Sequence, residues 1–173
     1  MGKRNIILVG PMGSGKSTIG NIIARKLNRE FQDSDHYIEQ KTGVDIARIF
    51  DIEGERGFRD RESNALKDLL EIDNRVIATG GGSVIREDNQ RLLRSRGYII
   101  FLDTSVKQQM QRLRRDKKRP LLQTDNPFQR LEALLNERRP IYLELADLAV
   151  KTDRRQARLL ATDIINQLPE NLR

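Results

Sequence analysis

The chain has 173 residues, a length that suits one domain and hardly allows two. Apolar residues make up 37% of it, enough for a single core, whereas charged residues reach 33% and the formal net charge is +7. The absence of cysteine excludes a disulfide framework and a thiolate metal site, and it fits a reducing cytosol. No apolar run approaches the ~20 residues that a membrane span needs, so we expect a cytoplasmic protein with no membrane partner.

The excess of positive charge has two interpretations, a solvated basic surface or a surface that binds an anionic partner. Nucleic-acid binders often add interleaved aromatic residues or a known motif. Here the three tyrosines and five phenylalanines are scattered singly. We therefore expect no nucleic-acid partner, and the highly charged surface favours a monomer.

Strand-like and helical patterns alternate along the chain. Residues 5–9 (NIILV) form a short continuous apolar run, typical of a buried parallel strand, and further strand-like runs lie at 30–33, 75–79, 98–102 and 148–152. Helical patterns lie at 16–27, 37–41, 46–52, 55–70, 87–95, 105–115, 128–145 and 155–168. Strands separated by helices predict a three-layer α/β/α domain with a parallel sheet, in which ligands bind at the carboxyl ends of the strands.

The segment GPMGSGKS at 10–17 matches the phosphate-binding pattern G-x-x-x-x-G-K-[ST] and lies between a predicted strand and a predicted helix. Its glycines let successive backbone N–H groups surround a phosphate, and the helix N-terminus adds partial positive charge. Lys16 is expected to reach the β and γ phosphate oxygens, and the Ser17 hydroxyl is expected to bind Mg²⁺. The pattern predicts binding of ATP and Mg²⁺, but it does not identify the phosphate acceptor.

A phosphate loop of this kind occurs in several classes of protein. A GTPase needs the guanine-reading pattern N-K-x-D, which is absent, and the switch-like D-x-x-G at 51–54 follows a helical pattern instead of a strand. A mechanical ATPase needs a long apolar strand ending in aspartate, which 98–103 imitates, but the chain is small for a motor. A small-molecule kinase fits the size best.

Two carboxylates follow the second predicted strand. If the extended backbone continues, Asp33 and Asp35 lie on the same side, where one serves Mg²⁺ and the other accepts a hydroxyl proton. The alternative is a helix N-cap formed by Ser34 or Asp35. One residue can serve both purposes.

Three glycines at 80–82 directly follow the third predicted strand. Such a run costs conformational entropy, so it indicates that another group approaches the backbone closely. The alternative is a flexible turn between strand and helix.

Basic residues supply the remaining candidates. The segment KKRP at 117–120 lies between two predicted helices, as expected for a lid that brings a cation to the γ-phosphate. Arg59, Arg138 and Arg139 are candidates for pairing with a substrate carboxylate, because arginine binds carboxylates through two parallel hydrogen bonds.

Jointly, these motifs resemble the shikimate kinase family over nearly the whole chain, from about Lys3 to Leu168. The resemblance rests on GPMGSGKSTIG at 10–20, DSD at 33–35, GFRDRE at 57–62, ATGGGSV at 78–84, RDKKRPLL at 115–122 and NERRPIY at 136–142. It implies a single P-loop kinase domain over 1–173 with a five-stranded parallel sheet, a substrate-binding segment at about 33–61 and a lid at about 112–124. It also implies Mg²⁺-dependent transfer of the γ-phosphate of ATP to the 3-hydroxyl of shikimate. The alternative within the enzymes is another small P-loop kinase that acts on gluconate or a nucleoside monophosphate.

The resemblance assigns roles by motif. The catalytic residues are Lys16, Asp35 as the base, and Arg119 from the lid. The implied nucleotide-binding residues are Gly13, Ser14, Gly15, Lys16, Ser17, Thr18, Arg112, Arg119 and Arg155. The implied metal-binding residues are Ser17 and Asp33, and shikimate is contacted by Asp35, Arg59, Gly81 and Arg138.

Overall fold

A computed structural model describes residues 5–114 and 122–173 of the chain. Its centre is a five-stranded sheet in the order β2-β3-β1-β4-β5, and all four strand pairs are parallel. The strands are β1 (Asn5–Val9), β2 (Glu30–Asp33), β3 (Arg75–Ala78), β4 (Gly97–Asp103) and β5 (Leu148–Lys151). The predicted strands are confirmed, with ends that differ by a residue at most.

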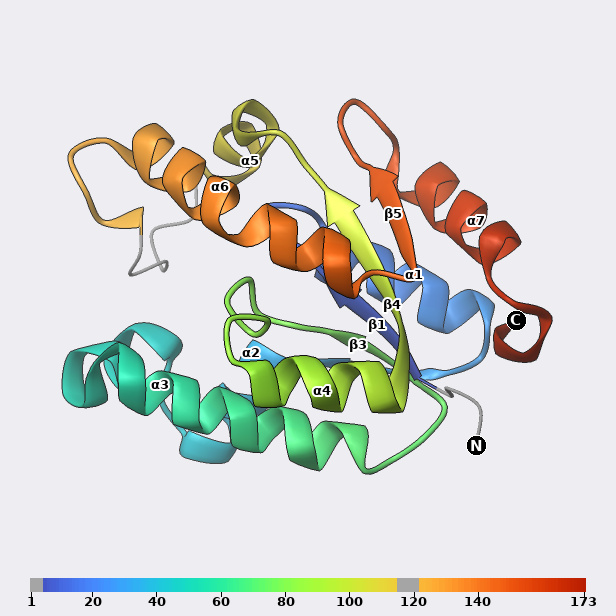
Figure 1. The fold of residues 1–173 in the computed structure, drawn as a ribbon, viewed down its shortest axis with the longest axis horizontal. Coiled ribbons are helices and arrows are strands. Elements are labelled where there is room, and N and C mark those ends of the chain that lie inside the picture. The colour runs from blue at the N-terminus through green and yellow to red at the C-terminus, as the bar shows by residue number, and fades with distance from the viewer. Residues whose placement is uncertain (1–4, 115–121) are drawn as a thin grey trace.

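Helices cover both faces of this sheet (Figure 1). The helices are α1 (Lys16–Lys26), α2 (Ser34–Thr42), α3 (Ile46–Leu70), α4 (Glu87–Arg96), α5 (Val106–Leu113), α6 (Pro127–Leu145) and α7 (Ala157–Gln167), followed by the 3₁₀ turn η2 (Glu170–Leu172). Helices α1 and α7 cover one face, and α3, α4 and α6 cover the other. The expected three-layer α/β/α architecture is therefore confirmed.

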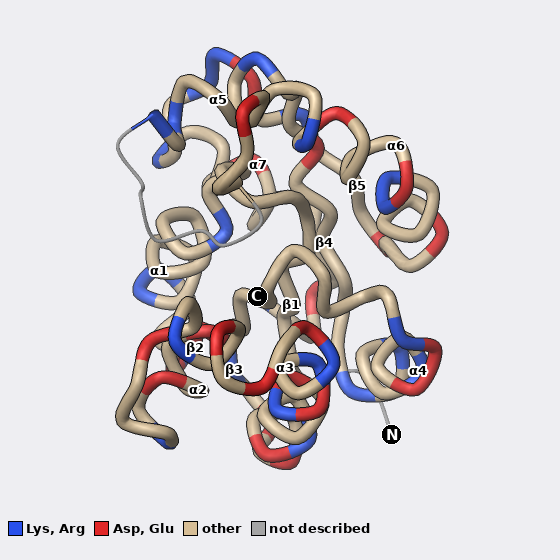
Figure 2. The backbone as a smooth tube through the Cα atoms, turned by 90° about the vertical axis from the view of Figure 1, so that its left-hand side faces the viewer, with Lys and Arg blue, Asp and Glu red and all other residues tan. Residues whose placement is uncertain are grey.

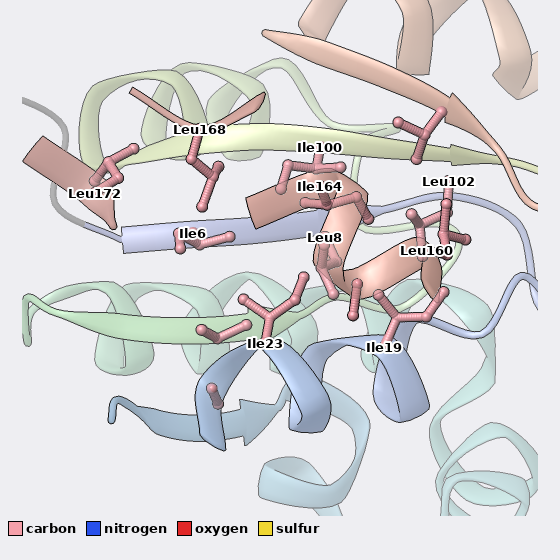
Figure 3. Packing of buried hydrophobic residues seen from close by; sticks show 14 residues of the cluster. Ile6, Leu8, Ile19, Ile23, Ile100, Leu102, Leu160, Ile164, Leu168 and Leu172 are labelled. Carbon is pink, nitrogen blue, oxygen red and sulfur yellow. The ribbon is translucent and has the colours of Figure 1, made fainter. Parts of the chain in front are cut away.

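The alternation of side chains along β1 explains why two cores form. Ile6 and Leu8 point to the face covered by α1 and α7, where they pack with Ile164 (Figure 3). Ile7 and Val9 point to the opposite face and pack with residues of α3, α4 and α6. Successive side chains of a strand point to opposite faces, so a strand that is apolar at every position must be covered on both.

Several helix ends differ from the sequence prediction by one or two residues, and the largest difference is at the start of α2. Helix α2 begins at Ser34 instead of residue 37, because the Asp33 carboxylate caps its first turn. Gly97 directly follows α4, its φ of −155° is extended, and it is already the first residue of β4. A Cβ there would lie 2.4 Å from the Ile7 side chain, so close packing is what requires glycine at this position.

Helix α3 consists of two helical pieces separated at Gly54, which has a φ of 70° and a ψ of −177°. The guanidinium of Arg61 donates two hydrogen bonds, of 2.8 and 2.6 Å, to the Glu53 carboxylate across this break. The D-x-x-G segment at 51–54 thus ends a helical piece and does not follow a strand, in agreement with the sequence analysis. The two predicted helices at 46–52 and 55–70 are confirmed as separate pieces.

Charged residues of both signs lie on α3 and α4 (Figure 2). Many of them pair, as Arg86 does with Asp60 at 2.8 Å and Arg94 with Glu144 at 3.3 Å. Within the residues that the structure describes, no helix combines the length and the apolar character that crossing a membrane would take.

Candidate active site

The phosphate loop connects β1 to α1 with a backbone that requires glycine. Gly10, Gly13 and Gly15 have φ angles of 149°, 76° and 89°, a region that other residues rarely adopt. Gly15 is the N-cap of α1, so the helix begins at Lys16 and the N–H groups of its first turn face the loop. The predicted phosphate cradle therefore has the backbone geometry of an anion site at a helix N-terminus.

The Lys16 ammonium lies within this loop. Its Nζ donates hydrogen bonds of 2.8 Å to the carbonyl oxygens of Gly10 and Pro11, and one of 3.3 Å to the hydroxyl of the buried Ser14. An ammonium that is held by the loop itself stands beside the position of any phosphate that the loop binds. Thr18 lies one residue beyond Ser17 in the first turn of α1 and is exposed.

Ser17 and Asp33 connect the phosphate loop to β2. The Ser17 hydroxyl donates a hydrogen bond to the Asp33 carboxylate, whose other oxygen accepts from the amides of Asp35 and His36 at 3.0 and 3.1 Å. Asp33 is thus the N-cap of α2, so the alternative with Ser34 or Asp35 as the cap is wrong. The expected continuation of the extended backbone beyond Asp33 is also wrong, because Ser34 is already helical.

A hydroxyl and a carboxylate in direct contact fit Mg²⁺, which prefers oxygen ligands and keeps several waters and phosphate oxygens in its shell. A cluster of three or more His, Cys, Asp or Glu side chains does not occur among the described residues. Mg²⁺ does not require such a cluster, because one or two carboxylates together with substrate phosphates usually hold it.

One cavity of about 570 Å³ lies next to the phosphate loop and brings together six of the residues to which the family resemblance assigns a role. They are Ser17, Asp33, Asp35, Arg59, Gly81 and Arg138. They come from the first turn of α1, the end of β2, the first turn of α2, α3, the loop after β3, and α6. Apolar side chains, among them Phe50 and Phe58, line another part of the cavity.

Two of the three glycines after β3 are required by the close approach of other groups. A Cβ on Gly80 would lie 2.8 Å from the Glu62 carboxylate and 2.9 Å from that of Asp35, and one on Gly82 would lie 2.3 Å from the Arg59 guanidinium. The interpretation as close approach is therefore confirmed at these two positions. A Cβ on Gly81 would lie 3.5 Å from the nearest atom, which is an ordinary contact. Close approach therefore does not require glycine at this position, and the backbone amide is the group that could bind a substrate.

Arg59 is held by carboxylates of its own helix. Its Nη1 donates a 2.8 Å hydrogen bond to Glu62, one turn further along α3, and its Nη2 donates a 3.3 Å bond to Glu55. Glu62 is fully buried and also accepts a 3.0 Å hydrogen bond from the Ser83 hydroxyl. The guanidinium is thus oriented before any substrate binds, which lowers the entropy cost of binding an anion.

Arg138 and Tyr142 lie one turn apart on α6 and are both buried. The Tyr142 hydroxyl donates a 2.5 Å hydrogen bond to the carbonyl of Gly81. Burial raises the pKa of Tyr142 to about 12, although the nearby Arg138 cation opposes that shift. The hydroxyl therefore keeps its proton and remains a donor at neutral pH.

The arginines assigned to the nucleotide have separate environments. Arg112 donates a 3.0 Å hydrogen bond to the Gly13 carbonyl and a 3.3 Å bond to the Thr152 carbonyl, and burial lowers its pKa. It therefore joins the phosphate loop to the end of β5. Arg155 follows that strand and pairs through its side chain with Asp163 of α7. Arg119 lies outside the described residues.

Arg139, the other arginine of the pair on α6, does not line the cavity. Its guanidinium donates hydrogen bonds of 3.3 and 2.9 Å to Asp103 at the end of β4, and this carboxylate raises the pKa of Arg139. Among the two neighbours, the structure thus selects Arg138 as the cavity residue.

Sequence reasoning missed Glu62 and Tyr142 as parts of this site. Glu62 stands three residues after Arg59, a spacing that brings side chains together on one helix face and that identifies it as a partner. For Tyr142 the only indication in the sequence is its position four residues after Arg138. Its contact with Gly81 joins residues that are 61 positions apart in the sequence. No local pattern indicates a contact of that kind.

A phosphate loop at the carboxyl edge of a parallel sheet, beside a cavity that holds a carboxylate and two arginines, defines the chain as a P-loop kinase of small molecules. Comparison with known proteins identifies the family. The family model described as shikimate kinase matches residues 12–169. A shikimate kinase of Vibrio campbellii is 54% identical over 168 residues, which cover 97% of this chain and 98% of that protein.

Solved structures agree. The shikimate kinase from Acinetobacter baumannii in complex with shikimate has a TM-score of 0.93 at 48% identity, with 96% of each chain covered. The shikimate kinase of Aquifex aeolicus has a TM-score of 0.82 at 37% identity, with 94% of each chain covered. A deoxyadenosine kinase from M. mycoides, at 18% identity and a TM-score of 0.59, shares the fold. The chain belongs to the shikimate kinase family, whose members are ATP-dependent kinases.

Proposed function

We propose that this chain transfers the γ-phosphate of ATP to the 3-hydroxyl of shikimate, giving shikimate 3-phosphate and ADP, on the route through chorismate to the aromatic amino acids. One observation carries this proposal: a single cavity beside the phosphate loop contains Asp35, Arg59 and Arg138. Shikimate is a small anion with several hydroxyl groups, so it needs a cationic grip for its carboxylate and a base for one hydroxyl. The Acinetobacter baumannii relative, which is 48% identical, was solved with shikimate bound.

Four residues bind the phosphate acceptor in this proposal. Arg59 and Arg138, both almost fully buried, pair with the carboxylate of shikimate. The amide of Gly81 donates to a substrate oxygen. Asp35, at the first turn of α2, accepts a hydrogen bond from the reacting hydroxyl and takes its proton as the new phosphate ester bond forms.

The donor side is assigned to the phosphate loop. Backbone amides from Gly13 to Thr18 surround the phosphates, and Lys16 neutralises the charge that moves to the β-phosphate during transfer. When bound, Mg²⁺ would supply further charge neutralisation, and Ser17 and Asp33 are the residues that would hold it. Arg112 and Arg155 lie beside the adenine in this proposal, and Arg119 reaches the phosphates.

The substrate-binding segment at about 33–61 and the lid at about 112–124 also remain proposals. The same holds for action as a cytoplasmic monomer that binds neither nucleic acid nor membrane. A charged fraction of 33% supports the monomer. Light scattering after size-exclusion chromatography tests it, with a mass near 20.0 kDa as the expected result.

Coupled ADP release with a panel of acceptors tests the proposed function. With ATP and Mg²⁺ we expect turnover with shikimate and only background release with gluconate, nucleoside monophosphates or no acceptor. Turnover with gluconate or a nucleotide, and none with shikimate, would contradict the proposal. Omission of Mg²⁺ with excess chelator is expected to abolish turnover and tests the metal separately.

A further inference from the structure

One face of helix α5 lies against the phosphate loop at Gly13. A Cβ on Gly13 would lie 3.1 Å from the Leu113 side chain and 3.3 Å from the Cα of Gln109. The Arg112 guanidinium donates a 3.0 Å hydrogen bond to the Gly13 carbonyl, and its Nη1 would lie 3.8 Å from a Cβ on Gly15. Gln109, Arg112 and Leu113 are three and four residues apart, so they share one face of the helix.

Helix α5 is anchored to the rest of the fold through the same residues. Gln109 is fully buried, and its side-chain amide donates a 3.2 Å hydrogen bond to the carbonyl of Thr104, directly after β4. Arg112 donates bonds of 3.4 and 3.3 Å to the hydroxyl and the carbonyl of Thr152, directly after β5. Leu113 packs against an apolar cluster that contains buried side chains of α6. The helix therefore joins the phosphate loop to the carboxyl edge of the sheet and to α6.

The bond from Arg112 fixes the peptide unit between Gly13 and Ser14. In a trans peptide the carbonyl and the following N–H point in opposite directions. The Gly13 carbonyl points to α5, and the Ser14 amide donates a 3.3 Å hydrogen bond to the Pro11 carbonyl within the loop. The same Pro11 carbonyl accepts a 2.8 Å hydrogen bond from Lys16 Nζ. The peptide unit that Arg112 holds is thus linked through one carbonyl to the ammonium of the loop.

The backbone of this loop needs such support. Three of its residues are glycines with positive φ angles, and glycine imposes little conformational preference of its own. A loop that becomes ordered only when its ligand binds loses affinity by the entropy of ordering. The contacts of α5 with Gly13 are made by the protein alone, so they give the loop its shape before a phosphate arrives.

We propose that Arg112 and Leu113 are positioning residues for the phosphate loop: they clamp Gly13, so that the loop and Lys16 keep the geometry that binds the phosphates of the nucleotide. Neither residue touches the phosphates in this proposal. The role is separate from the adenine contact that the family resemblance implies for Arg112, because it acts on a ligand without a base. The inference rests on the donor side of the proposed function and is independent of the acceptor.

The first test uses inorganic tripolyphosphate with Mg²⁺, a ligand that has no adenine, in calorimetric titrations. Leu113→Ala is expected to raise the Kd for tripolyphosphate about threefold to tenfold, because the loop is then ordered at the expense of binding. Leu113→Met conserves the volume of the side chain and should stay within about twofold of wild type. The Kd for shikimate should stay within about twofold in both variants.

Met110→Ala is the matched control for this change. Met110 lies on α5 and packs against the same apolar cluster, so its truncation loosens that cluster by a similar loss of side chain. Its Tm should fall as that of Leu113→Ala does, whereas its Kd for tripolyphosphate should stay within about twofold of wild type. Far-ultraviolet circular dichroism and the Tm establish that each variant is folded.

The second test separates positioning by Arg112 from the attraction of its charge. Arg112→Met is expected to raise the Kd for tripolyphosphate about threefold to tenfold, as for the loss of one hydrogen bond. This factor should persist when the salt concentration rises from about 0.05 to 0.5 M, which screens the attraction between separated charges. Lys107→Met removes an exposed cation from the same helix, and its smaller effect should vanish at the higher salt concentration.

Three results overturn the inference: a wild-type Kd for tripolyphosphate in Leu113→Ala or Arg112→Met, an equal rise in Met110→Ala, or an Arg112→Met effect that disappears at high salt. If Leu113→Ala does not fold, the salt series of Arg112→Met decides alone. Failure of the proposed function is recognised separately, because it concerns turnover of shikimate by the wild-type protein, whereas these titrations contain no acceptor. A wild-type protein that does not bind tripolyphosphate contradicts the donor side and the inference together.

Discussion

Arg59 and Glu62 form an ion pair of 2.8 Å between two side chains that are 9% and 1% exposed. Both stand on the second piece of α3, one helical turn apart. A buried carboxylate is stable as an anion only beside a cation and hydrogen-bond donors, and here Arg59 and Ser83 supply both. Glu62 therefore belongs to the structure of the cavity wall as well as to the alignment of Arg59.

Glu62→Gln is expected to lower the free energy of unfolding by about 3 kcal/mol, because it leaves a buried guanidinium without its main counter-charge. For a chain of this size that loss corresponds to a fall in Tm of roughly 6–12 °C. Glu55→Gln is the matched control, since Glu55 pairs with the same guanidinium but is 54% exposed, and exposed pairs contribute at most about 1 kcal/mol. Equal falls in the Tm of the two variants would contradict the assignment.

Asp35→Asn tests the proposed base. The amide keeps the size of the side chain but cannot accept the proton of the reacting hydroxyl, so kcat is expected to fall about 100-fold or more. The Kd for ATP should stay near the wild-type value, because Asp35 lies on the acceptor side. Steady-state kinetics and nucleotide titration measure the two quantities.

The control for this change is Asp60→Asn, which alters an exposed carboxylate that does not line the cavity. Its kcat is expected to remain within about twofold of wild type, as for most surface substitutions. Equal losses of turnover and of ATP binding in Asp35→Asn would exclude its role as a base.

Arg138→Lys is expected to raise the KM for shikimate about tenfold or more, because an ammonium cannot form the two parallel hydrogen bonds of a guanidinium. The neighbouring Arg139→Lys is the control, since Arg139 pairs with Asp103 and does not line the cavity. Initial-rate kinetics at saturating ATP measure both. An unchanged KM in Arg138→Lys would remove Arg138 from the carboxylate grip.

The buried phenol of Tyr142 predicts a pH dependence of stability. Its pKa of about 12 in the folded protein exceeds the ordinary value of 10.0, chiefly because burial disfavours the phenolate. Below pH 10 both states keep the proton and stability is fully present. Between about pH 10 and 12 the unfolded chain loses the proton first, so the free energy of unfolding falls, by roughly 2–3 kcal/mol at most.

Urea denaturation of wild type and Tyr142→Phe between pH 8 and 11, as far as the proteins remain folded, measures this effect as a difference. All other titrating groups contribute equally to the pH dependence of the free energy of unfolding in both proteins, so their contributions cancel in the difference. The free energy of unfolding of wild type minus that of Tyr142→Phe should become smaller as the pH rises above about 10. A difference that stays constant over this range would show that the Tyr142 hydroxyl does not titrate with a raised pKa.

The strands and the phosphate loop could be predicted from sequence because their signals are local. A continuous apolar run such as 5–9 has to be covered on both faces, and the spacing of Gly10, Gly15 and Lys16 follows from the geometry of a strand, a phosphate loop and a helix. The start of α2 was missed because a side chain, Asp33, ends the extended backbone by capping the helix at once. The signals for strand and cap overlap at that single residue.

The cavity was predictable only in part, for a related reason. Asp35, Arg59 and Arg138 are polar residues in motifs, but the contacts that orient two of them are with buried partners. The bond from Tyr142 to Gly81 spans 61 residues, and Gly82 is required by a guanidinium 23 positions earlier in the chain. Such pairs form only when separate elements pack, so they depend on the tertiary structure.

Gly54 divides the cavity wall between two helical pieces. Ile46 and Phe50, on the first piece, line the cavity with apolar side chains, whereas the second piece contributes the apolar Phe58 beside the charged Arg59 and Glu62. The two backbone torsion angles of Gly54 therefore set the angle between a wholly apolar part of the cavity wall and the part that carries the Arg59–Glu62 pair. Ile46 and Phe50 take no part in the Arg59–Glu62 pair, so substitutions on the first piece change the shape that the cavity offers to an acceptor without replacing the residues of the ionic grip.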